Sequence, residues 1–155
     1  MEKDDLQLFE AASESTALVC LDHEQYQKML VPQLTDLKYK VHVGLYEEDV
    51  LLKLRTYSYD VIVVYENFKG STLATNPILQ KLVSEPAAQR REHFVVLLSH
   101  RFPTNDSLNA FVHSVDRIVN IADLANFKPV LRRGMTEHRE MYHFFQSTLK
   151  TVQTM

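Results

Sequence analysis

Five short apolar segments alternate with longer amphipathic segments along the chain. They cover residues 17–21, 41–45, 60–65, 94–98 and 117–119. The third contains four consecutive β-branched residues, Val61 to Val64, which is typical of a strand buried on both faces in a parallel sheet. Apolar strands that alternate with helices of about 10–15 residues predict a doubly wound α/β fold. We expect a five-stranded parallel sheet in the order 2-1-3-4-5.

Several polar residues stand where a helix should begin. Asp22, with Gln25 three residues later, predicts an N-cap for the first helix, and Asp106 does the same for the helix that carries Leu108, Phe111 and Val112. Asn76 precedes Pro77, and proline is favoured at the first position of a helix. Pro32 predicts a kink or a new turn within the first helix.

The last helix is expected to be longer than the fold requires. From Leu131 onward its apolar positions recur at alternating spacings of four and three, a heptad-like pattern. Three or four turns would cover the sheet, which leaves an apolar stripe beyond it: Met141, Tyr142, Phe145, Leu149 and Val152. The stripe either folds back to complete the core or binds a second copy or another protein, and a homodimer is the simplest such solution. We therefore divide the chain into a tail (1–15), a domain (16–138) and an extension of the last helix (139–155).

Composition limits the partners of the protein. The chain has 155 residues, a net charge of −3 and no long run of basic residues, so we expect no nucleic-acid partner. It has no apolar stretch of about 18 residues and no secretory signal at its start, which predicts a cytoplasmic protein without a membrane partner. The single cysteine, Cys20, lies in an apolar segment and is expected to be a buried, inert thiol.

Residue spacing argues against the common cofactor and metal sites. The three glycines, Gly44, Gly70 and Gly134, are far apart, which excludes a phosphate-binding loop and a dinucleotide fingerprint. The seven histidines lack ligand spacing, so we expect them at the surface or at helix ends, with no metal and no cofactor bound. The pairs 90–91 and 132–133 of arginines are expected to lie on solvated helix faces.

The pattern of strands and helices, with the segment Tyr-Asp-Val-Ile-Val-Val at 59–64, resembles the receiver domain of bacterial response regulators over residues 16–138. The resemblance assigns the family's acidic pair to Leu21 and Asp22 and its phosphoacceptor aspartate to Tyr65. The serine or threonine that ends the fourth strand is retained as Ser99. The lysine and proline that follow the fifth strand fall on Asn120 and Ile121.

This assignment implies a degenerate pocket, as in pseudo-receivers. Asp22 alone is a poor Mg²⁺ site, and the phenol of Tyr65 cannot replace a carboxylate nucleophile. Strand alternation directs Glu66 away from the side of Tyr65, so it is not expected to substitute. The resemblance therefore implies a non-enzymatic signalling or scaffolding module that acts through protein contacts. The alternative is an atypical receiver or a small-ligand or ion sensor that uses Asp22, Tyr65, Ser99 and Asn120.

Overall fold

The computed structural model describes residues 15–154, with side chains described to residue 152. The expected tail, residues 1–15, therefore lies outside the described residues except for Ser15, which begins the first strand. The strands are β1 (Ser15–Cys20), β2 (Tyr39–Gly44), β3 (Val61–Tyr65), β4 (Phe94–Ser99) and β5 (Arg117–Asn120). The helices are α2 (Glu24–Asp36), α3 (Glu47–Thr56), η1 (Phe68–Gly70), α4 (Pro77–Val83), α5 (Ala87–Arg90), α6 (Ser107–Val112), η2 (Ile121–Asn126) and α7 (Phe127–Thr154).

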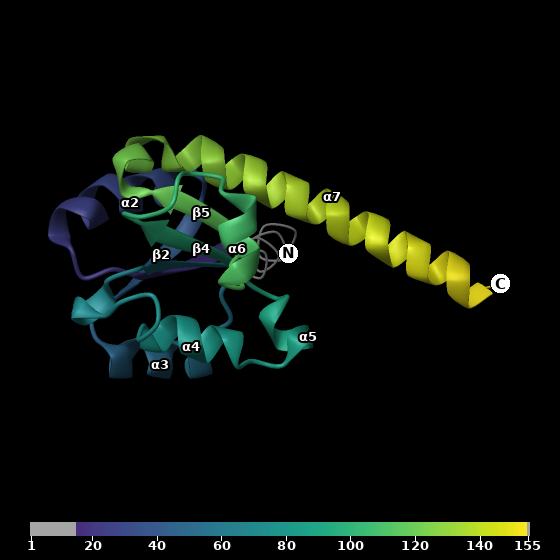
Figure 1. The fold of residues 1–155 in the computed structure, drawn as a ribbon, viewed down its shortest axis with the longest axis horizontal. Helices are drawn as coiled ribbons and strands as arrows, with labels where there is room; N and C mark the ends of the chain where they lie inside the picture. The colour runs from purple at the N-terminus through teal and green to yellow at the C-terminus, as the bar shows by residue number, and fades with distance from the viewer. Residues whose placement is uncertain (1–14, 155) are drawn as a thin grey trace, which may run out of the picture.

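The described strands form one parallel sheet in the order β2-β1-β3-β4-β5, as the sequence pattern predicted (Figure 1). The central strand β3 is buried at every position because helices cover both faces of the sheet. Its register with β4 pairs Val61 with Phe94 and Tyr65 with Leu98. The fold prediction is thus confirmed, including the long C-terminal helix.

Side chains that alternate along the strands divide the core into two halves. One half, the α2/α7 core, packs Val61 and Val63 against α2 and α7, with Leu34 and Leu131 among the helix residues. The other half, the α3/α4/α6 core, packs Ile62 and its neighbours against the remaining helices. Each half buries its apolar side chains almost completely, so the sheet is held from both sides.

Most of the predicted helix starts are confirmed, and one is wrong. The side chain of Asn76 accepts hydrogen bonds at the start of α4, and that of Asp106 accepts one at the start of α6. The N-cap of α2 is His23 rather than Asp22, because Nδ1 of His23 accepts from the backbone N–H of Tyr26. The carboxylate of Asp22 instead accepts a hydrogen bond from the backbone N–H of Lys69. α2 continues through Pro32 as a single element.

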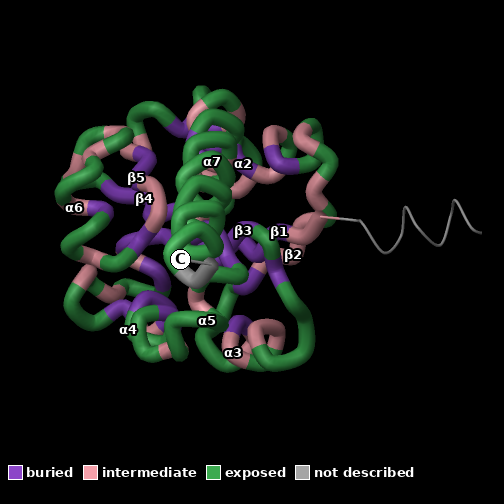
Figure 2. The backbone as a smooth tube through the Cα atoms, turned by 90° about the vertical axis from the view of Figure 1, so that its right-hand side faces the viewer, coloured by how far each residue is buried: buried purple, intermediate pink, exposed green. Residues whose placement is uncertain are grey.

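Helix α7 has 28 residues, about 42 Å at 1.5 Å per residue. Its first turns lie on the sheet, where Phe127 and Leu131 are buried and Met135 packs at the edge of the α2/α7 core. Beyond these turns the helix leaves the domain and continues into solvent (Figure 1 and Figure 2). Met141 is 73% exposed, so the alternative in which the helix folds back over the core is not the arrangement of this chain.

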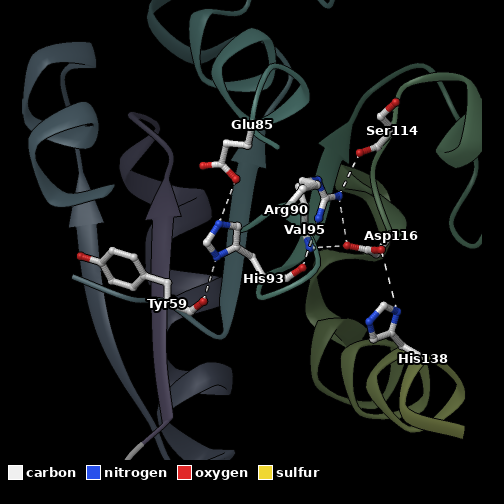
Figure 3. Close-up of polar contacts among 8 residues, drawn as sticks. All are labelled: Tyr59, Glu85, Arg90, His93, Val95, Ser114, Asp116 and His138. Carbon is white, nitrogen blue, oxygen red and sulfur yellow. Dashed lines mark hydrogen bonds and ion pairs between the residues drawn. The ribbon is translucent and has the colours of Figure 1, made fainter. Parts of the chain in front are cut away.

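Polar side chains tie the amino ends of β4 and β5 to the neighbouring helices (Figure 3). His93 is buried, with Nε2 3.1 Å from a carboxylate oxygen of Glu85 and Nδ1 3.2 Å from the carbonyl oxygen of Tyr59. Arg90 donates to the carboxylate of Asp116 at 3.2 Å, and that carboxylate also accepts from the backbone of β4. The expectation of surface histidines is therefore wrong for His93, and that of a solvated arginine is wrong for Arg90. Both are held by partners distant in sequence.

No helix in the described part of the chain combines the length and the apolarity needed to cross a membrane.

Candidate functional site

The six residues of the expected pocket lie near the carboxyl ends of the strands, but they do not form one cluster. Leu21 and Tyr65 belong to the α2/α7 core, and Ile121 packs at its edge. The remaining three, Asp22, Ser99 and Asn120, each bond to a different part of the surrounding loops. The division follows strand alternation, because consecutive residues point to opposite faces of a sheet.

Tyr65 occupies the position that the resemblance assigns to the phosphoacceptor aspartate. Its ring is almost fully buried and meets Tyr26 edge to face at a centroid distance of 5.9 Å. Its hydroxyl oxygen lies 2.7 Å from Nε2 of His100, the first residue after β4. Burial, followed by the nearby Tyr26 and Asp22, raises the pKa of Tyr65 above its ordinary value of 10. The phenol is therefore neutral at physiological pH and already bonded.

Asp22 closes a loop. One of its carboxylate oxygens accepts a hydrogen bond of 3.1 Å from the backbone N–H of Lys69 in the loop after β3. Lys69 has a φ of +54°, a left-handed conformation that residues other than glycine adopt infrequently. The carboxylate therefore supports an unusual turn, and its expected acidic neighbour is replaced by the buried Leu21.

Ser99 is paired with Glu66, a contact that strand alternation alone did not suggest. Glu66 follows Tyr65, and Ser99 follows Leu98, so the parallel register brings the two to the same level of the sheet. A carboxylate oxygen of Glu66 accepts from the backbone N–H of His100 at 3.0 Å and from the hydroxyl of Ser99 at 3.4 Å. The same hydroxyl oxygen accepts two backbone N–H groups of the β4–α6 loop. Extending the β3–β4 register by one residue would have predicted this pair.

Asn120 caps the turn that follows β5. Its side-chain oxygen accepts from the backbone N–H of Ala122 at 2.9 Å, and its amide donates to the carbonyl of Phe102 at 2.8 Å. The position assigned to the family's lysine thus holds a neutral, structurally bonded amide. The ammonium of Lys69, in the segment after β3, lies 4.4 Å from the ring centroid of Tyr46.

The strand-end groups are therefore bonded mainly to one another and to loop backbone. A phosphoryl-transfer site needs a metal held by several oxygen ligands and a cation for the developing charge. Within residues 15–154, no group of three His, Cys, Asp or Glu side chains is arranged to hold a metal ion. The arrangement is suited to fixing the loops in one conformation.

The apolar stripe on α7 is the second candidate site. Exposed fractions of its five side chains range from 45% at Leu149 to 73% at Met141. Phe144, 72% exposed, lies beside the stripe and was not predicted as part of it. Helix α6 adds three more exposed apolar side chains, Leu108, Phe111 and Val112. The spacing of these residues in the sequence could not show whether they would be buried or exposed.

Comparison with known proteins identifies solved structures with a similar fold. No family model matches the chain, and no curated protein matches it significantly. A response regulator from Thermotoga maritima is similar over 79% of this chain and 98% of its own, with 13% identity and a TM-score of 0.58. The orphan response regulator HP1043 of H. pylori is similar over 77% of this chain and 95% of its own, with 12% identity and a TM-score of 0.56.

A third solved structure is a fusion that carries a trimeric coiled-coil segment of yeast Spc42. It is similar over 92% of this chain and 91% of its own, with 17% identity and a TM-score of 0.62. At these identities the similarity concerns the fold alone. The chain has the fold of a response regulator receiver domain, extended by a long C-terminal helix.

Proposed function

We propose that the protein is a non-enzymatic signalling or scaffolding module, a pseudo-receiver that works through protein contacts and not through aspartyl phosphorylation. The observation that carries this proposal is the bonding of Tyr65 to His100 at the position of the missing phosphoacceptor. A neutral, buried phenol offers no carboxylate to phosphorylate. Asp22 and Glu66, the nearby carboxylates, already accept hydrogen bonds from loop backbone.

Incubation with Mg²⁺ and acetyl phosphate, a small phosphodonor, tests the chemical half of the proposal. Intact-mass spectrometry should show no added phosphate at neutral pH. A receiver domain of ordinary sequence serves as the positive control in the same tube. Mass added to this chain, removed by hydroxylamine as expected for an acyl phosphate, would overturn the proposal.

For the interaction half, we propose a second copy of the chain as the partner of the α7 stripe. An isolated helix of about 12–15 residues is marginal in water, and contiguous apolar surface rarely stays uncovered. The positions flanking the heptad seam include Met141, Gln146 and Thr148, all uncharged, so two copies can approach without repulsion there. A solved structure with a similar fold carries a trimeric coiled-coil segment, which supports helix-mediated contact between chains and not a particular number of copies.

Light scattering of the full chain and of a chain ended after His138 tests this assignment. The full chain should be a dimer, and the shortened one a folded monomer with the circular dichroism of an intact α/β domain. Phe145→Ser should give the same monomer, whereas Gln146→Ala, on the same helix turn, should leave the dimer intact. A monomeric full chain, or a shortened chain that is still a dimer, would contradict the assignment.

The alternative, a small-ligand or ion sensor at the strand ends, requires some of these bonded groups to release their partners. An amide NMR titration with Mg²⁺ and beryllofluoride distinguishes this sensor from the non-binding module.

A further inference from the structure

A groove of about 310 Å³ lies between α6, β5 and α7, on the side of α7 that faces α6. Its lining includes apolar side chains, among them Phe94, Phe111 and Met141, and charged ones, among them Arg117 and Glu137. Phe111 is 83% exposed, the highest value among the large apolar side chains of the described residues. An exposed phenylalanine at the edge of a groove is typical of a surface that another molecule covers.

Met141 makes this groove continuous with the α7 stripe, because it belongs to both. Exposed apolar side chains therefore lie on α6, at Met141 beside the groove, and along the exposed end of α7. Leu108 and Val112, 72% and 61% exposed, are among those on α6. One partner can cover the groove and the stripe together.

The stripe by itself is small for a stable self-association. From Met141 to Thr154 it spans two heptads, whereas coiled coils are usually sustained over at least three or four. At its exposed fractions, the stripe offers roughly 500 Å² of apolar surface per copy, which puts a pair at the lower limit of about 1,000 Å² for a specific interface. Additional surface is needed, and the groove provides it.

We infer that the second copy binds antiparallel, so that the end of its α7 reaches Met141 at the edge of the groove between α6 and α7 of the first. This inference rests on the proposed self-association through α7 and specifies its geometry. In an antiparallel seam the layers pair Tyr142 with Val152 of the second copy, and Phe145 with Leu149 of the second copy. By symmetry each copy contributes its helix end to the other's groove.

Position along the helix favours this orientation over a parallel one. In a parallel pair the two helix ends meet about 20 Å beyond the groove, so Phe111 and its neighbours stay uncovered. Antiparallel pairing instead brings the end of the second α7 to Met141, which lines the groove.

Disulfide trapping on the full-length chain distinguishes the two orientations. Tyr142→Cys and Val152→Cys are prepared separately and mixed under mild oxidation, and the native Cys20 is retained because it is buried. The mixture should form the mixed disulfide, and Val152→Cys alone should form at least tenfold less dimer. Efficient cross-linking of Val152→Cys alone would show a parallel pair, which overturns the orientation and leaves the proposed self-association standing.

A substitution on α6 gives an independent reading by light scattering and sedimentation. Phe111→Ser should weaken the dimer at least tenfold, because its ring lies outside the helical seam and contributes only if the groove is covered. Leu52→Ser, at an exposed apolar side chain of α3, should not weaken it. An unchanged dimer for Phe111→Ser would contradict the inference, and a monomeric wild type would contradict the self-association itself.

Discussion

The hydroxyl of Tyr65 and the imidazole of His100 form a 2.7 Å hydrogen bond across the carboxyl ends of β3 and β4. The two rings also meet at nearly right angles, with a centroid distance of 5.6 Å, and Tyr26 packs against Tyr65 from α2. The phenol thus fills and closes the position where the receiver resemblance assigns an aspartate. In this chain the carboxyl edge of β3 is therefore occupied by packed, hydrogen-bonded aromatic side chains.

Tyr65→Asp is expected to restore the family's residue without restoring its chemistry. The substitution removes a buried ring, at a cost of at least about 3 kcal/mol of unfolding free energy. The new carboxylate would still lack a second acidic neighbour, because Leu21 is buried and Asp22 accepts from Lys69. Denaturant unfolding measures the destabilisation, and mass spectrometry after acetyl phosphate treatment should detect no phosphate. Stoichiometric phosphorylation of this variant would show that the rest of the pocket is intact.

Gly134→Ala should destabilise the protein, although the same change in an exposed helix usually stabilises it by about 1 kcal/mol. A Cβ at Gly134 would lie 2.8 Å from Nε of Arg117 and 3.1 Å from Cζ of Phe94. The guanidinium has little freedom to move, because it donates to Glu137 at 2.7 Å and to Asn105 at 3.3 Å. We expect a loss of about 1–3 kcal/mol, typical of overpacking, in chemical denaturation.

The same substitution in an Arg117→Ala background is the control for this mechanism. With the guanidinium removed, the penalty of Gly134→Ala should shrink by at least half. An undiminished penalty would place the clash at Phe94 or in the helix backbone.

Stability should decline as the pH falls below about 6.5, in part because of His42. Burial, followed by Lys40 and Lys53, lowers the pKa of His42 below that value in the folded protein, where Nδ1 lies 2.7 Å from the hydroxyl of Tyr59. The unfolded chain then binds the proton first, so acidification favours unfolding, and the contribution is fully present only above the unfolded pKa.

Denaturant unfolding between about pH 5 and 7.5 measures this dependence. His42→Gln should flatten the slope of unfolding free energy against pH, and His143→Gln, on the exposed part of α7, controls for the loss of a histidine. Equal slopes for wild type and His42→Gln would show that His42 does not contribute to the pH dependence of stability.

Cys20 should be unreactive in the native protein. It is fully buried in β1, and burial, together with the nearby Asp49, raises the pKa of its thiol far above the ordinary value, which leaves almost no thiolate. A thiol reagent such as dithionitrobenzoate should react at least a hundredfold more slowly than in guanidinium chloride. Ser147→Cys, on the exposed part of α7, provides a fast-reacting thiol in the same fold, so that two rates should be seen. A single fast rate would indicate that β1 opens readily.

The sheet was predictable because its signal is local. Runs such as Val61 to Val64 and Phe94 to Leu98 are apolar at every position, which only a doubly covered strand requires. The N-caps Asn76 and Asp106 were found for the same reason, since the residues that they cap lie two or three positions away.

The site was less predictable because its contacts are long-range. Asp22 was expected to cap the helix that follows it, but it bonds to Lys69, 47 residues later, in a left-handed turn with no local signature. Alternation correctly separated Glu66 from Tyr65, yet it took the strand register to place Glu66 beside Ser99. The prediction that Arg90 is solvated was wrong for the same reason, because its partner Asp116 lies 26 positions away in the sequence.

An amide NMR titration of the full chain, first with Mg²⁺ and then with beryllofluoride, tests the central claim most directly. An ordinary receiver domain is titrated in parallel, and the ligand concentrations that saturate it set the range used for this chain. The account predicts no saturable shifts at Asp22, Tyr65, Ser99 or the loop at Lys69, because these groups are already bonded within the chain. Saturable shifts at those amides would show that the strand-end pocket still binds an ion, and the protein would then be an atypical receiver or an ion sensor.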